Sequence, residues 1–165
     1  MKKILTVLVS AVLLAGLAGL PAMAAEEGPK YGQEVGDTAK PVDLKTFDGE
    51  GFNTGKLTKK TMFVFVNSVC SMCAREMRDL DKYSDKFAKA DVYLVAVDMN
   101  LERVAQKYKK YAEKFGMLHD PEFVFGEAVG LYSTPATLVV EKDGKITYKK
   151  SGYRPEVLKE VAASL

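Results

Sequence analysis

The sequence predicts an α/β domain with a central mixed sheet and helices on both faces. An apolar run rich in Val and Phe occupies residues 61–66, and a second run, with three valines, occupies residues 91–98. After each run, apolar residues recur every three or four positions. Such runs are typical of buried strands, and such recurrence is typical of amphipathic helices. Two further apolar runs flank Asp143-Gly144, and a closing helix follows them. That pair of runs predicts an antiparallel hairpin at the end of the sheet.

The elements can be assigned in order along residues 41–165. Turn residues at 48–51 between apolar flanks predict a small hairpin. Gly116 and Pro155 mark the end of one helix and the start of the last. The predicted helices are 73–87, 101–115, a short one around 123–129, and 155–165; the later strands are 136–141 and 146–151. This order predicts two parallel crossovers that lead into the antiparallel hairpin.

Residues 1–24 have the order of a secretory signal peptide. A basic start precedes an apolar run at 4–20, and the small-x-small Ala22-Met23-Ala24 predicts cleavage after Ala24. An uncleaved membrane anchor is the alternative, because the run reaches the lower limit of about 17 residues for spanning a bilayer. We therefore expect a periplasmic or otherwise extracytoplasmic protein, in which a thiol pair can persist as a disulfide. Residues 25–40 are expected to form a flexible N-terminal segment that contributes little to the core.

The charge balance excludes a general attraction to polyanions. The chain has 24 basic and 22 acidic residues, and cleavage of the leader would remove two of the basic residues, Lys2 and Lys3. The remaining charges are interleaved, so binding to nucleic acid is not expected. One core accounts for the apolar helix faces, and we expect a monomer.

The only two cysteines, Cys70 and Cys73, point to redox exchange. Cys70 follows a predicted strand and opens a predicted helix, where unsatisfied backbone N–H groups stabilise a thiolate. Cys73 lies within the first helical turn, where it can attack a mixed disulfide formed on Cys70. This chemistry requires neither a metal nor another cofactor.

Other roles for the pair remain open from the residues alone. A structural disulfide across so short a loop contributes only about 2 kcal/mol in the chain-entropy picture. A zinc site lacks a second cysteine pair, and His119 is the only histidine. Copper binding or delivery is the non-enzymatic alternative, because thiolates, Met72 and His119 are ligands that copper uses.

A second feature lies far along the chain. Pro135 directly precedes the predicted strand at 136–141, and proline can adopt the cis form far more cheaply than other residues. The plainer reading is a proline that merely begins the strand.

Residues 67–77 and 133–137 together resemble the thioredoxin superfamily, in particular its exported TlpA/ResA-like branch. Residues 36–44 are similar to the entry segment of that branch, and residues 141–146 are similar to its terminal hairpin. A C-x-x-C motif alone is weak support. Its place between strand and helix, with Thr-Pro and an Asp-Gly hairpin following, makes a specific combination.

The resemblance implies an exported thiol-disulfide oxidoreductase that reduces protein disulfides and is itself reduced by a membrane-bound donor. It implies that Cys70 attacks, that Cys73 resolves and forms the Cys70–Cys73 disulfide, and that Pro135 is cis with Thr134 pairing its backbone to substrate. It also implies that Glu76 tunes the thiols or moves protons. An exposed glutamate that merely favours the helix dipole is the alternative for Glu76.

The chain departs from the family pattern at several positions. Departures fall at the usual tryptophan, proline, buried aspartate and glutamate, which are replaced by Val69, Met72, Val64 and Ala136. They bear on the redox potential and the partner rather than on the exchange chemistry. A peroxiredoxin-like peroxide reductase is the other enzymatic alternative. Peroxiredoxins need a threonine near the reacting cysteine, but the corresponding position here is Asn67.

Overall fold

The computed structural model describes residues 32–165, so the expected leader at 1–24 lies outside the described residues. Within the described residues, seven strands form one sheet in the order β2-β1-β5-β4-β3-β6-β7. The strands are β1 (Asp43–Thr46), β2 (Gly51–Asn53), β3 (Thr61–Val66), β4 (Asp91–Ala96), β5 (Met117–His119), β6 (Ala136–Val140) and β7 (Ile146–Ser151). The helices are α1 (Ser71–Lys82), the 3-10 helix η1 (Ser84–Phe87), α2 (Leu101–Phe115), α3 (Val124–Ala128) and α4 (Pro155–Ser164).

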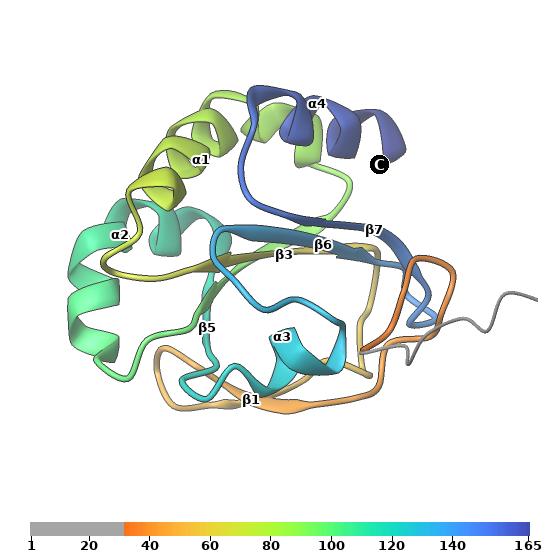
Figure 1. Ribbon diagram of the computed structural model, residues 1–165, viewed down its shortest axis with the longest axis horizontal. Coiled ribbons are helices and arrows are strands. Elements are labelled where there is room, and N and C mark those ends of the chain that lie inside the picture. The colour runs from red at the N-terminus through yellow and green to blue at the C-terminus, as the bar shows by residue number, and fades with distance from the viewer. Residues whose placement is uncertain (1–31) are drawn as a thin grey trace, which may run out of the picture.

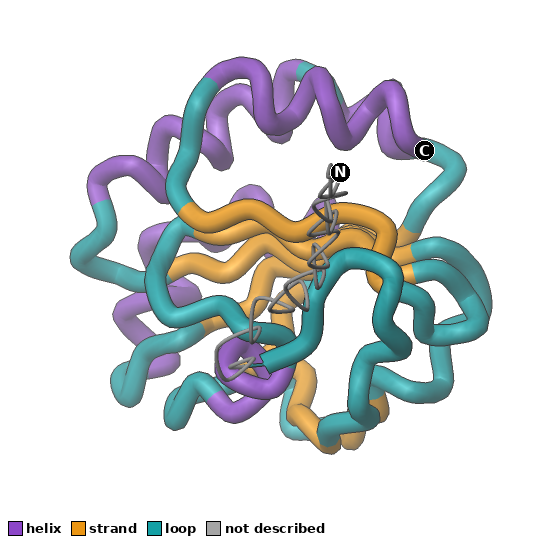
Figure 2. Tube along the Cα trace, turned by 45° about the vertical axis from the view of Figure 1, so that its right-hand side comes forward, coloured by secondary structure: helices purple, strands orange, loops and turns teal. Residues whose placement is uncertain are grey.

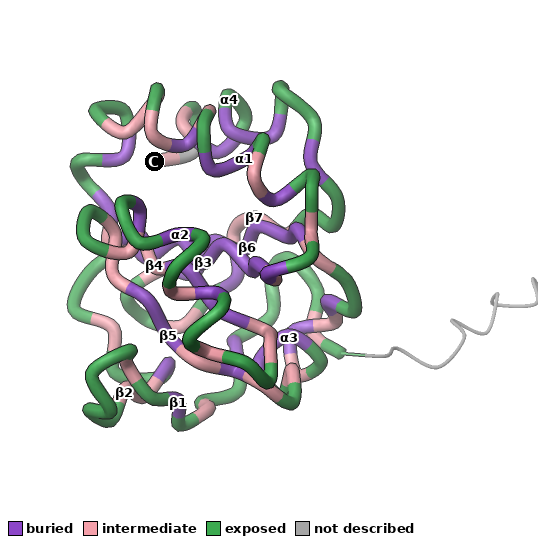
Figure 3. The backbone as a smooth tube through the Cα atoms, turned by 90° about the vertical axis from the view of Figure 1, so that its left-hand side faces the viewer, coloured by how far each residue is buried: buried purple, intermediate pink, exposed green. Residues whose placement is uncertain are grey.

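Helices cover both faces of the sheet, which confirms the predicted fold class (Figures 1 and 2). Successive side chains of a strand point to opposite faces, so β3 supplies two cores. Met62 and Val64 belong to the α1-side core, which also takes side chains from α1, α2 and α4. Phe63 and Phe65 belong to the α3-side core, which includes Phe125 of α3. β3 and β6 are buried along their length, and much of the loop backbone is exposed (Figure 3).

The topology differs from the prediction at the second crossover. β3 and β4 are parallel, as predicted. The second parallel crossover ends at β5, a strand that the sequence analysis missed, and β6 pairs antiparallel with β3. The prediction that strand 136–141 closes the second crossover was wrong, because the three residues of β5 are too few to give a periodic signal.

Most predicted element boundaries agree with the structure. The helix predicted at 73–87 begins at Ser71, ends at Lys82 and continues after Tyr83 as η1. Gly116 ends α2 with φ of 75°, a region that favours glycine, as its predicted capping role requires.

Residues 32–40, the described part of the expected N-terminal segment, lie against the β6–β7 hairpin. The amide of Gly36 donates to the carbonyl of Ile146 at 2.9 Å, and that of Ala39 donates to the carbonyl of Gly144 at 2.8 Å. Ala39 is buried in the α3-side core. Within residues 32–165, no helix is long and apolar enough to cross a membrane.

Candidate active site

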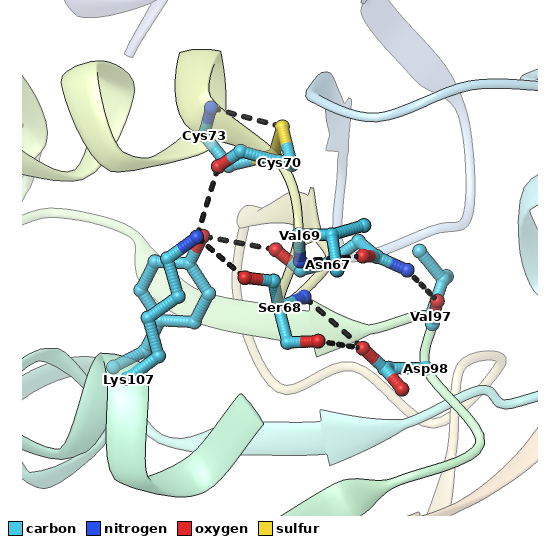
Figure 4. Close-up of a disulfide and its surroundings, with 9 residues drawn as sticks. Asn67, Ser68, Val69, Cys70, Cys73, Val97, Asp98 and Lys107 are labelled. Carbon is cyan, nitrogen blue, oxygen red and sulfur yellow. Dashed lines mark hydrogen bonds between the residues drawn. A yellow bond between two sulfur atoms is a disulfide. The ribbon is translucent and has the colours of Figure 1, made fainter. Parts of the chain in front are cut away.

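Cys70 and Cys73 form a disulfide where β3 leads into α1 (Figure 4). Cys70 is the N-cap of α1, and its Sγ accepts a hydrogen bond from the amide of Cys73 at 3.0 Å. Cys70 is partly exposed, whereas Cys73 is fully buried in the α1-side core. Only Cys70 therefore offers its sulfur to a partner, and it does so at a helix N-terminus, which favours negative charge.

The turn before Cys70 is held by the two residues that follow β4. The Asn67 amide donates to the carbonyl of Val97 at 2.8 Å, and its oxygen accepts from the amide of Val69 at 2.9 Å. Ser68 donates to the Asp98 carboxylate through its hydroxyl and, at 3.1 Å, through its amide. The Asn67 side chain thus shapes the turn, where a peroxiredoxin-like site would need a threonine.

Two side chains of α2 hold the same turn from another direction. Lys107 Nζ donates to the carbonyl oxygens of Ser68 at 2.6 Å and Cys70 at 3.1 Å, and Tyr108 donates its hydroxyl to the carbonyl of Asn67 at 3.1 Å. Neither residue was predicted from the sequence as a site residue. Tyr108 was visible only as part of an apolar helix face, and Lys107 only as one of several lysines on α2.

Glu76 lies one helical turn after Cys73 and is completely buried. Its Oε1 accepts a hydrogen bond from Thr137 Oγ1 at 2.7 Å, and its Oε2 has no hydrogen-bond partner among the described residues. Desolvation raises the pKa of Glu76 to about 7, although the bond from Thr137 partly opposes the shift. The alternative of an exposed glutamate is therefore wrong. Thr137, which the sequence analysis did not single out as a site residue, is its partner.

The Thr134–Pro135 peptide is cis. It directly precedes β6, and Ala136 pairs with Phe65 near the end of β3 that leads to Cys70. The two motifs, far apart in sequence, therefore lie at the same end of the sheet. Pro135 is buried and Thr134 is half-buried.

The candidate copper ligands are not assembled into a cluster. His119 lies in β5 with its Nε2 3.0 Å from the carbonyl oxygen of Asp98. Within residues 32–165, no three His, Cys, Asp or Glu side chains are grouped so as to hold a metal ion.

The site can be compared with known proteins. The thiol-disulfide oxidoreductase ResA of Bacillus thuringiensis is 26% identical over 118 residues, a match that covers 68% of this chain and 61% of ResA. The chain thus matches about three fifths of the length of that relative. Its fold resembles StoA of Bacillus subtilis, with a TM-score of 0.59, 21% identity and coverage of 74% of this chain and 96% of StoA.

A secreted disulfide oxidoreductase of Mycobacterium tuberculosis also shares the fold, with a TM-score of 0.61, 18% identity and coverage of 75% of this chain and 96% of that protein. The sequence profile of the Redoxin family matches residues 34–165, nearly all of the described chain. The chain therefore belongs to the Redoxin family.

Proposed function

We propose that this chain is a thiol-disulfide oxidoreductase that reduces disulfides of other proteins through Cys70 and Cys73. The observation that carries the proposal is the asymmetry of the pair, in which one sulfur is accessible at a helix N-terminus and the other is buried behind it. The relation to ResA, a thiol-disulfide oxidoreductase, supports the same chemistry.

The reaction begins from the dithiol form. The Cys70 thiolate attacks a substrate disulfide, so a bond forms between Cys70 and one substrate sulfur while the other leaves as a thiolate. The Cys73 thiolate then attacks Cys70 Sγ and releases the second substrate thiolate. Two electrons have passed to the substrate, and the chain is left with its disulfide. Glu76 lies one helical turn after Cys73, and we propose that it accepts the Cys73 proton.

Exposed apolar side chains around the disulfide support a protein substrate. Val69 directly precedes Cys70, Met72 lies between the two cysteines, and Tyr132 precedes the cis peptide. Apolar groups of this kind are typical of interfaces between proteins. We propose that the backbone of Thr134, beside Pro135, pairs with the substrate chain next to the reacting sulfurs.

We further propose an extracytoplasmic location, with the leader cleaved after Ala24. The secreted character of the M. tuberculosis protein of the same fold supports export. In that compartment a membrane-bound dithiol donor would return Cys70–Cys73 to the dithiol. Because the helices of the chain cover both faces of its own sheet, we propose that it acts as a monomer.

Insulin reduction with dithiothreitol as electron source tests the function. The wild-type protein should accelerate the reduction. Cys70→Ser should abolish the acceleration. When reduced Cys73→Ser is mixed with insulin in the absence of dithiothreitol, it should accumulate a mixed disulfide with insulin, and later addition of dithiothreitol should release it. A wild-type protein that fails to cycle between disulfide and dithiol in glutathione buffers would contradict the proposal.

A further inference from the structure

Lys107 extends from α2 to the carbonyl oxygens of the two residues on either side of Val69 (Figure 4). Its two acceptors are the carbonyls of Ser68 and of Cys70, the cysteine that caps α1. Other α2 lysines lie elsewhere, since Lys110 and Lys114 pair with Asp81. Lys107 therefore brings a positive charge to the reacting cysteine from outside the motif that contains it.

We propose that Lys107 is a positioning residue of the thiol-disulfide site, whose ammonium fixes the turn at residues 68–70 and stabilises the Cys70 thiolate. The inference rests on the proposed function, because a thiolate exists only in the dithiol form that carries out the exchange. It assigns a redox-tuning role to a residue of α2, beyond the two cysteines and Glu76.

Two physical effects support this role. Hydrogen bonds from an ammonium are stronger than neutral ones, so the two carbonyl bonds restrain the turn against α2. A nearby positive charge also favours the charged form of an acid. Because Lys107 is exposed, salt screens this field, and the second effect should weaken as ionic strength rises.

Other charged or titratable groups near Cys70 also affect the stability of its thiolate. The Asp98 carboxylate, two residues after β4, accepts hydrogen bonds from Ser68, and Glu76 lies one helical turn after Cys73 in α1. Both oppose a thiolate when they are ionised. Burial raises the pKa of Tyr108 to about 12, so this neighbour on α2 is neutral near pH 7. The segment at 133–135, before β6, carries no ionisable side chain.

The test compares Lys107→Gln with Lys109→Gln, which removes the same charge from an exposed position on the same helix. The rate of iodoacetamide alkylation of the reduced full-length protein is measured against pH. This rate reports Cys70, because Cys73 is buried. We expect Lys107→Gln to raise the apparent pKa of Cys70 and to slow alkylation at pH 7 about two- to tenfold. Lys109→Gln should match the wild type, and Lys107→Arg should restore most of the rate.

High salt distinguishes the electrostatic effect of Lys107 on the Cys70 thiolate from the effect of its hydrogen bonds to the turn at residues 68–70. In 1 M salt, the difference between the wild type and Lys107→Gln should shrink, because exposed charges are screened. If Lys107→Gln does not fold, Lys107→Met takes its place, since it keeps the apolar stem.

A folded Lys107 variant with an unchanged pH profile overturns the inference, as does an equal shift in Lys109→Gln. Either result leaves the proposed function intact if the wild type still reduces insulin. Failure of the wild type to cycle is a separate outcome, which overturns the proposed function itself.

Discussion

Glu76 is an acid that the fold buries against the hydroxyl of Thr137. Its Oε1 is hydrogen-bonded to Thr137, and its Oε2 has no partner among the described residues. The unfolded chain loses this proton near pH 4.5, whereas burial raises the pKa of the folded carboxyl to about 7. Between these values the folded state binds more protons, so the free energy of unfolding falls as the pH rises.

We expect Glu76→Gln to remove this pH dependence. Between pH 5 and pH 8, the oxidised wild type should lose up to about 3 kcal/mol of stability that the variant keeps, since one pKa unit corresponds to about 1.4 kcal/mol. Glutamine can still accept the Thr137 hydrogen bond but has no charge to desolvate. Urea unfolding of both proteins at the two pH values measures the difference. Parallel stability curves would show that Glu76 ionises as easily in the folded chain as in the unfolded one.

The sequence predicted which residues mark the site better than it predicted their surroundings. The cysteine spacing and the Thr134-Pro135 dipeptide are local patterns, and both could be found without a structure. The burial of Glu76 could not, because the residue precedes Met77 at the edge of an apolar helix face and periodicity does not decide which way an edge residue turns. Its partner Thr137 lies on a strand far along the chain.

At the scale of elements, α1 begins with the reacting cysteine as its own cap. Cys70 Sγ accepts from the amide of Cys73, the bond that a serine oxygen makes at an ordinary helix N-terminus. The cap therefore ties the stability of the first turn of α1 to the residue that performs the chemistry.

Comparing two variants that both lack the disulfide measures how much this cap contributes to stability. We expect Cys70→Ser to be more stable than Cys70→Ala by about 1 kcal/mol, because only serine can accept the Cys73 amide. Urea unfolding under reducing conditions measures the difference, with Cys73 as a thiol in both proteins. Equal midpoints and slopes would mean that the α1 amide is satisfied by another group.

Sequence patterns did not predict β5 or the contacts of α2 with the turn before α1, because neither gives a periodic signal. β5 has three residues and gains its identity only from pairing with β1 and β4. Without it, strand 136–141 was the only candidate to close the second crossover. Similarly, α2 was predicted from its apolar face, but its contacts with residues 67–70 come from Lys107 and Tyr108, which reach a segment distant in sequence.

At the scale of the whole molecule, the sheet divides the interior into two cores. The redox pair lies on the α1-side core, which includes Cys73 of α1 and Val104 of α2. The α3-side core includes Val129, after α3, and is built partly by Ala39 from the N-terminal segment. Both β3 and β4 supply side chains to the two cores, which explains why their runs are apolar on both faces of the sheet.

This division predicts that mutations in the two cores act independently. Val104→Ala and Val129→Ala each remove two buried methyl groups, and each should cost about 1–3 kcal/mol including the cavity left behind. Because the sheet separates the two sites, the double variant should lose the sum of the two costs within about 0.5 kcal/mol.

A single urea transition with an unchanged slope should accompany the loss, because both cores share one sheet. Two separate transitions would instead mean that the α3-side core unfolds alone, and a coupling energy well above about 0.5 kcal/mol would mean that strain passes through β3. In the independent case, Val104→Ala should slow insulin reduction more than Val129→Ala does, since only the α1-side core packs against Cys73.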